Sequence, residues 1–208
     1  MGKTARVPKL AALLAAAALA TSALPSNAAE PPSSPDLSAA FQAAAAKYDA
    51  PREVLVGVGF AESHLDGHNG LPSQANGYGV MHLVSNNQNK TMSEATKLTG
   101  LPVEKLAKDN GSNILGAAAV LDAYADQGGL TDRSDLGKWY GVIAKYSHSA
   151  DGPTARLYTD EVYRIIGTGV RAAGVTTEPK TVTATARCRA TTTPTRVRTG
   201  TGTTTCSW

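Results

Sequence analysis

Apolar residues recur at helical spacing from about residue 36 to residue 174. Leu37, Phe41 and Tyr48 lie on one face of a first helix, and Pro51 suits the first turn of a second, where its missing N–H costs nothing. Further helices are expected from Thr91 to Gly100, from Pro102, from Asn113 to Gly128, from Ser134 to Tyr146 and from about Thr154 to Val170. The pattern predicts a mainly α, compact single domain without internal repeats.

One stretch interrupts the helical pattern. Residues 63–90 are rich in Gly, Asn, Ser and His, which indicates loops. The segment "GYGVMHLV" within it, residues 77–84, favours a short strand or hairpin.

The first 28 residues have the pattern of a secretory signal peptide. Lys3, Arg6 and Lys9 form a positive region, "LAALLAAAALATSAL" is apolar, and "SNA" places small residues before Ala29. The apolar run is too short and wrongly flanked for a spanning helix. We therefore predict cleavage after Ala28, secretion, and no membrane anchor.

The composition divides the remaining chain into three parts. Residues 29–35 form a linker, residues 36–174 form the domain, and residues 175–208 form a Thr/Arg-rich tail. Fourteen of the 34 tail residues are Thr, and large apolar groups are rare. Such a segment buries too little surface to offset its ordering entropy, so we expect it to be disordered. Cys188 and Cys206, both in the tail, could pair in an oxidising compartment.

The charge is also divided. Residues 29–174 carry 12 Lys and Arg against 16 Asp and Glu, whereas residues 175–208 carry five against one Glu. An acidic domain with a basic tail is not typical of a nucleic-acid-binding protein. The basic tail could rest weakly on an anionic cell wall.

The first candidate for chemistry is Glu62, in "GFAESHLDGHNG" at residues 59–70. Leu55, Val58 and Glu62 share the core-facing side of the second helix, near its end. Burial and the negative end of the helix dipole both favour the protonated carboxyl group that a general acid needs. The spacing leaves open whether Glu62 is such an acid or a solvated helix end.

Metal and serine chemistry find less support. His64, Asp66, His68 and His82 are residue types that bind zinc. However, His64 and His68 follow the expected helix end, so no helix face aligns them, and no HExxH motif occurs. We predict no metal and no cofactor. The chain also lacks a GxSxG motif, so a serine nucleophile is not predicted.

Three further segments combine glycine, amide and aromatic residues. Tyr78, between two glycines, could offer a flat face to a sugar ring, although the segment also suits a turn into a core strand. Asn113 could face a ligand or cap a helix. Tyr146 ends an apolar helix beside a polar loop and could equally be a buried tyrosine with a satisfied hydroxyl.

Taken in order, these motifs resemble a family. The "ES" at Glu62, "GYGVMHL", "NILGA" at Asn113, "KYS" at Tyr146 and the helix "RLYTDEVYRII" are similar to the soluble lytic transglycosylase or goose-type lysozyme-like domain, over residues 36–172. The local sequence is most similar to the N-terminal domain of secreted actinobacterial N-acetylmuramoyl-L-alanine amidases. A zinc amidase domain follows in those proteins. The tail here has no His, so we expect a stand-alone relative or a truncated or frame-shifted product.

The resemblance implies a lysozyme-like fold, peptidoglycan glycan strands as the partner, a cell-wall location and a monomer. Glu62 would protonate the β-1,4 link between N-acetylmuramic acid and N-acetylglucosamine. It would then take a proton from the C6 hydroxyl, which closes a 1,6-anhydro ring. The residues that the resemblance assigns to substrate binding or to the support of Glu62 are Ser63, Tyr78, Val80, Met81, His82, Asn113, Tyr146 and Ser147.

The chain departs from the family at two of these positions. His82 stands where the family has Gln, and Ser147 stands where it has Asn. Two alternatives to a transglycosylase therefore stay open. One is a non-catalytic cell-wall-binding module, and the other is a lysozyme-type hydrolase in which Asp66 positions water.

Overall fold

The computed structural model describes residue 2 and residues 36–183. The predicted signal peptide and linker lie outside the described residues, as does the tail from residue 184 with Cys188 and Cys206. The helices are α1 (Leu37–Lys47), α2 (Arg52–Ser63), α3 (Thr91–Thr99), α4 (Val103–Lys108), α5 (Asn110–Gln127), α6 (Tyr140–Tyr146) and α7 (Gly152–Thr168). The expected mainly α fold is confirmed.

Two small antiparallel hairpins and two 3₁₀ turns complete the described elements. Strand β1 (Gly77–Tyr78) pairs with β2 (Leu83–Val84), as the "GYGVMHLV" pattern predicts. Strand β3 (Val170–Ala172) pairs with β4 (Val175–Thr177). The 3₁₀ turns are η1 (His68–Gly70) and η2 (Leu136–Trp139), and η2 occupies the first part of the helix expected from residue 134 to residue 146.

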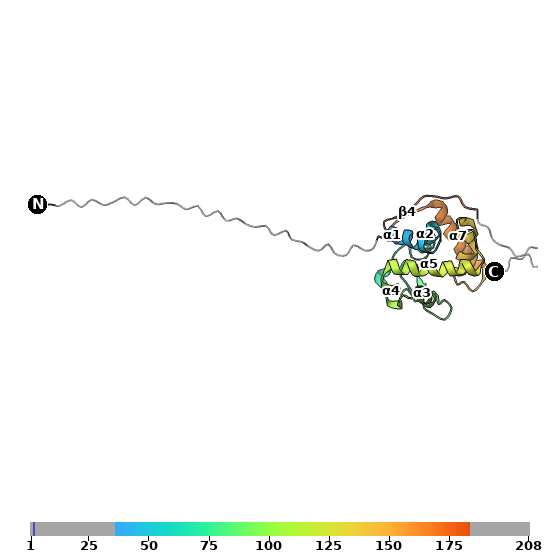
Figure 1. Cartoon of the computed structure of the whole chain (residues 1–208), viewed down its shortest axis with the longest axis horizontal. Coiled ribbons are helices and arrows are strands. Elements are labelled where there is room, and N and C mark those ends of the chain that lie inside the picture. The colour runs from blue at the N-terminus through green and yellow to red at the C-terminus, as the bar shows by residue number, and fades with distance from the viewer. Residues whose placement is uncertain (1, 3–35, 184–208) are drawn as a thin grey trace, which may run out of the picture. The chain divides into compact units, whose positions relative to one another are not determined.

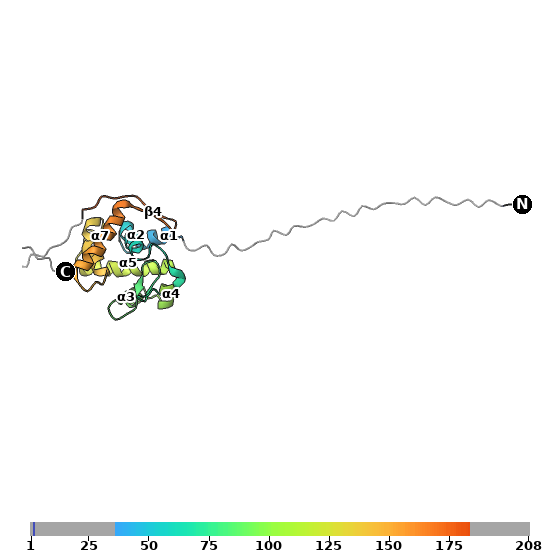
Figure 2. The same ribbon diagram turned by 180° about the vertical axis from the view of Figure 1, so that it is seen from behind.

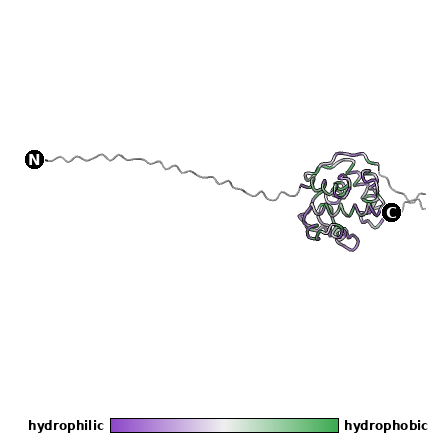
Figure 3. The backbone as a smooth tube through the Cα atoms, viewed as in Figure 1, coloured by the Kyte–Doolittle hydropathy of each residue, from purple (hydrophilic) through white to green (hydrophobic). Residues whose placement is uncertain are grey.

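The core is organised around α5. Figures 1 and 2 show α5 crossing the middle of the domain, with α1, α2 and α7 on one side and α3 and α4 on the other. The largest fully buried side chains include Phe41, Leu55, Ile114, Leu121 and Trp139. Each contributes about 1.5–3 kcal/mol through burial. Figure 3 shows hydrophobic residues gathered in the interior and hydrophilic residues on the outer loops.

The end of α2 fixes the place of Glu62. His64 adopts the left-handed conformation (φ 54°), and its N–H donates to the Phe60 carbonyl, which ends the helix. Glu62 thus lies in the last turn, facing α7, the helix with which α2 makes its main contact. Its expected position beside the core is confirmed.

Helix α5 begins earlier than the sequence predicts. Asp109 is its N-cap, and the Asp109 carboxylate accepts from the Ser112 N–H at 2.7 Å. Asn113 therefore lies inside the first turn, where it is fully buried. The predicted start at Asn113 is wrong because α4 and α5 are separated by only one residue, which leaves no loop signal between them.

The domain also continues beyond the predicted boundary at residue 174. Val175 and Thr177 are buried in the β3–β4 hairpin. The Arg52 guanidinium donates to the Thr176 carbonyl and to the Ser38 hydroxyl, so it links β4 with the starts of α1 and α2. Residues 175–183 therefore belong to the described structure.

No helix within residues 36–183 is both long enough and apolar enough to cross a membrane.

Candidate functional site

The Glu62 carboxylate is held at both oxygens. Its Oε1 accepts from the Tyr158 hydroxyl at 2.6 Å, and its Oε2 lies 3.1 Å from His82 Nδ1. The Glu62 side chain is 16% exposed, and within the described part of the chain no Lys or Arg pairs with it. A largely buried carboxylate oriented by a phenol and an imidazole is the arrangement expected of a general acid or base rather than of a surface ion pair.

Tyr158 reaches Glu62 from α7. Burial raises the pKa of its phenol well above the ordinary value, and the Glu62 charge adds to this effect. The hydroxyl therefore keeps its proton and remains a donor to the carboxylate. In the sequence Tyr158 stands only within the motif "RLYTDEVYRII", and nothing local connects it with Glu62.

His82 joins Glu62 to Ser73. The Ser73 Oγ lies 2.7 Å from His82 Nε2 and also accepts from the Ala75 and Gly77 amides. With both lone pairs of the hydroxyl occupied, its own proton points to Nε2. His82 therefore presents Nε2 to Ser73 and Nδ1 to Glu62.

Gly77 makes the His82 position possible. A Cβ at Gly77 would come within 2.2 Å of the His82 ring. His82 itself adopts φ 50°, a conformation that non-glycine residues enter rarely. Such strain gathers at functional sites, where the surrounding structure imposes it.

The Asn113 side chain holds the turn between β1 and β2 in place. Its Oδ1 accepts from the Met81 N–H at 2.8 Å, and its Nδ2 donates to the Tyr78 and Leu106 carbonyls at 2.9 Å each. A Cβ at Gly79 would clash with this amide, so the turn and Asn113 fit each other. Asn113 thus supports the site rather than facing solvent.

Ser63 and Tyr146 bind the same turn. The Ser63 hydroxyl donates to the Val80 carbonyl at 2.7 Å, and the Tyr146 hydroxyl donates to the Met81 carbonyl at 2.9 Å. Tyr146 is buried near Glu62, whose charge helps to raise its pKa, yet the two make no hydrogen bond. Val80 and Met81 are fully buried, so in this conformation their side chains pack in the core instead of lining a groove.

Tyr78 and Ser147 have local partners. The Tyr78 hydroxyl donates to the Asn76 side chain, and the ring is partly exposed beside the turn. Ser147 Oγ donates to the Ala144 carbonyl and lies 2.9 Å from Ser149 Oγ. Of the predicted site residues, the structure gathers Glu62, Ser63, His82, Asn113 and Tyr146 around one turn.

A second polar cluster lies beside this site and was missed from the sequence. The Tyr124 hydroxyl donates to Glu94 at 2.5 Å and lies 3.0 Å from His148 Nε2. Burial raises the pKa of Tyr124, so its hydroxyl keeps its proton. Asp66, the residue that would position water in a lysozyme-type hydrolase, is instead 69% exposed, and its carboxylate accepts from the His68 N–H.

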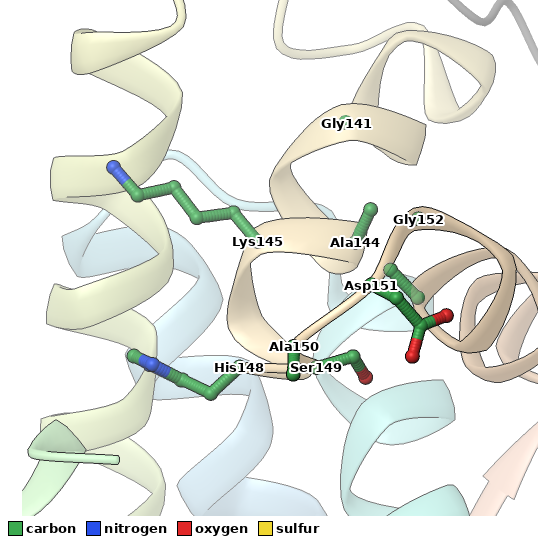
Figure 4. A pocket seen from close by; sticks show the side chains of 9 residues that line it. Gly141, Ala144, Lys145, His148, Ser149, Ala150, Asp151 and Gly152 are labelled. Carbon is green, nitrogen blue, oxygen red and sulfur yellow. The ribbon is translucent and has the colours of Figure 1, made fainter. Parts of the chain in front are cut away.

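A cavity of about 450 Å³ opens next to His148, between the end of α6 and the start of α7. Figure 4 shows Lys145 and His148 extending toward α5, where they contact Gln127 and Tyr124, while the Asp151 carboxylate points the other way. Glu62 does not line this cavity. The cavity is therefore not part of the Glu62 site.

Comparisons with protein-family models, curated proteins and solved structures found no match. The geometry of the side chains thus carries the functional argument. Within residues 36–183, no three His, Cys, Asp or Glu side chains come close enough together to hold a metal ion.

Acidification is expected to destabilise the fold through His148. Burial lowers the pKa of His148 below its ordinary value of 6.5, although Glu94 acts in the opposite direction. The unfolded chain therefore takes up this proton at a higher pH than the folded chain, and the free energy of unfolding falls as the pH drops through 6.5.

Urea unfolding at about pH 7.5 and about pH 5.5 measures this dependence. The loss of stability between the two pH values should be smaller in His148→Gln than in the wild type. His68→Gln, at an exposed position, is the matched control and should behave like the wild type. An equal loss in His148→Gln and wild type would contradict the assignment.

Proposed function

We propose that this chain is a secreted peptidoglycan lytic transglycosylase. It would cleave the β-1,4 link between N-acetylmuramic acid and N-acetylglucosamine, with Glu62 as the general acid and base. The observation that carries the proposal is the Glu62 carboxylate itself, 16% exposed and held by Tyr158 and His82 at the end of α2. The likeness of the ordered motifs to the lytic transglycosylase family supports the same activity.

The reaction requires one carboxyl group that changes its protonation state. Protonated Glu62 donates to the glycosidic oxygen, the bond from that oxygen to C1 of the muramoyl residue breaks, and the N-acetylglucosamine end leaves with a 4-hydroxyl. The C6 hydroxyl then attacks C1 and returns its proton to Glu62. The product is a 1,6-anhydro ring, and Glu62 is ready for another cycle. Most glycosidases need two carboxylates, whereas this route needs one.

Tyr158 and His82 would act by holding the carboxylate in one orientation. A general acid must lie within hydrogen-bond reach of the proton acceptor, so a rotating carboxyl group loses efficiency. His82 follows directly on the β1–β2 segment that is bound by Ser63, Asn113 and Tyr146, so these hydrogen bonds also fix the position of His82. The site is therefore pre-organised before a glycan arrives.

Mass spectrometry of digested peptidoglycan tests the proposal. The purified full chain should release muropeptides with 1,6-anhydro ends. Ordinary reducing ends would overturn the transglycosylase in favour of a hydrolase. Sedimentation with the cell wall without any released fragment would overturn it in favour of a binding module.

Tyr158→Phe is expected to lower the turnover number for glycan cleavage at least about tenfold, because a hydrogen bond to a charged group contributes roughly 1.5–3 kcal/mol. The Michaelis constant should change little, since the hydroxyl holds Glu62 rather than the glycan. Kinetics on soluble glycan strands measure both constants.

Tyr163→Phe is the matched control for Tyr158→Phe. It also removes a buried hydroxyl of α7, but one that donates to the Leu136 carbonyl at 2.5 Å, away from Glu62. Its turnover should match the wild type. A Tyr158→Phe variant as active as this control would show that Glu62 does not depend on the phenol.

A further inference from the structure

Three side chains from different elements form one line of close polar contacts. The Ser73 hydroxyl lies 2.7 Å from His82 Nε2, and His82 Nδ1 lies 3.1 Å from Glu62 Oε2. Ser73 comes from the loop before β1, His82 from the turn before β2, and Glu62 from α2. Glycan cleavage by Glu62 makes no use of the Ser73 hydroxyl.

The order of atoms is that of a nucleophilic serine centre. In such centres the carboxylate holds Nδ1 of the imidazole, and Nε2 takes the proton of the hydroxyl. His82 has the same order here, with Nδ1 facing Glu62 and Nε2 facing the Ser73 hydroxyl. Both contacts fall within or at the 2.6–3.2 Å range that proton transfer needs.

The surroundings hold this line in place from both ends. Tyr158 occupies the other oxygen of Glu62, so the carboxylate cannot turn away from His82. At the other end, only a glycine at position 77 leaves room for the His82 ring. The backbone of His82 adopts the left-handed conformation that places the ring there. The arrangement therefore does not depend on a flexible surface contact.

We propose that Ser73, His82 and Glu62 form an ester-hydrolysing centre for short acyl esters. This ester-hydrolysing activity does not rest on the transglycosylase proposal, because the three side chains would act on an ester whether or not Glu62 protonates a glycan. The sequence alone predicts no serine nucleophile. Ser73 lies in "LPSQAN", outside any GxSxG motif, and only the fold brings it to His82.

The reaction follows from the positions of the protons. The Ser73 Oγ gives up the longer of its two amide bonds, that from Ala75, and the freed lone pair attacks the ester carbonyl carbon. The hydroxyl proton passes to His82 Nε2, while Glu62 stabilises the resulting imidazolium. The bond to the alcohol oxygen then breaks, and His82 returns the proton to that oxygen. Water attacks the acyl-serine in the same way, releasing the carboxylic acid and restoring Ser73.

Two backbone amides hold the Ser73 hydroxyl in position. The N–H groups of Ala75 and Gly77 lie 3.2 Å and 3.1 Å from the Ser73 Oγ. Both amides are directed at the nucleophile itself, so they fix the hydroxyl beside His82. Gln74 and Ala75 are exposed, which leaves the serine open to an ester carried on a larger molecule.

Covalent labelling of the full chain tests this centre. A fluorophosphonate should label one serine, and peptide mass spectrometry should locate the label on Ser73. p-Nitrophenyl acetate should be hydrolysed at least about 100-fold faster by the wild type than by Ser73→Ala. His82→Gln should lose both the label and the hydrolysis, although Ser73 and its contacts with the two amides are retained.

Ser93→Ala is the matched control, because Ser93 is an exposed serine of α3. It should keep the label and the wild-type rate, and a melting curve for each variant checks folding. A label on another serine, a label that persists in His82→Gln, or equal rates in Ser73→Ala and wild type would overturn the proposal. The readouts follow acyl transfer alone, so their failure would leave the proposed glycan cleavage untouched.

Discussion

Replacing Glu62 by glutamine is expected to reduce peptidoglycan cleavage by roughly 10²- to 10⁴-fold, the usual contribution of a general acid or base. The amide has nearly the same shape, but it can neither give a proton to the glycosidic oxygen nor accept one from the C6 hydroxyl. Release of 1,6-anhydro muropeptides over time measures the effect. The fold should persist, because the tyrosine and the turn around the side chain are unchanged.

Glu104→Gln is the control for Glu62→Gln. Glu104 is 77% exposed on α4 and, among residues 36–183, pairs with Lys108 alone, so its loss should leave cleavage at the wild-type rate. If Glu62→Gln cleaves as fast as Glu104→Gln, another group supplies the proton and the proposed mechanism fails.

The largest effect on stability is expected from Asn113→Ala, at about 3–5 kcal/mol lost from the free energy of unfolding. Three buried backbone groups lose their partner: the Met81 N–H and the carbonyls of Tyr78 and Leu106. An alanine side chain cannot replace any of these bonds, and the site is too enclosed for the groups to turn to solvent.

Urea unfolding measures this loss, and hydrogen exchange at the Met81 amide should become faster in the same variant. Asn87→Ala, at an exposed loop position, should stay within about 0.5 kcal/mol of the wild type. A loss below about 1 kcal/mol for Asn113→Ala would mean that the buried groups find other partners.

The helices were accessible from the sequence wherever the apolar stripe was long and its ends were marked. Gly100, for example, was expected to end α3, and it does so in the left-handed conformation. The α4–α5 boundary was not accessible, because Asp109 both ends one helix and caps the next. The average composition of the tail likewise concealed Val175, whose burial against the core depends on pairing with β3.

The candidate site likewise contains residues that could be predicted from the sequence and residues that could not. Glu62 could be selected because it continues a core-facing stripe of its own helix. Tyr158 could not be assigned to it, since 96 residues separate the two and periodicity carries no information about partners at that distance. Ser73 was hidden for a different reason: a serine in a polar loop is ordinary until the fold places a histidine beside it.

The identity of His82 gains a physical meaning from this geometry. A glutamine, the residue of the resembling family, has one carbonyl and one amide group at its tip. An imidazole has a nitrogen on each side of a rigid ring, and it can therefore touch Glu62 and Ser73 at once. The two proposals differ at this residue, because glycan cleavage uses only the contact of Nδ1 with Glu62, whereas the ester centre also uses Nε2.

The contact between α2 and α7 also has a kinetic consequence. The hydrogen bond from Tyr158 to Glu62 spans 96 residues, and that from Arg52 to Thr176 spans 124. Contacts between residues so far apart in the sequence form late, because the chain loses the entropy of closing a long loop before the contact can stabilise it. We therefore expect a refolding chain to gain helical circular dichroism first and the anchored carboxylate last, so that a partly folded molecule is helical but inactive.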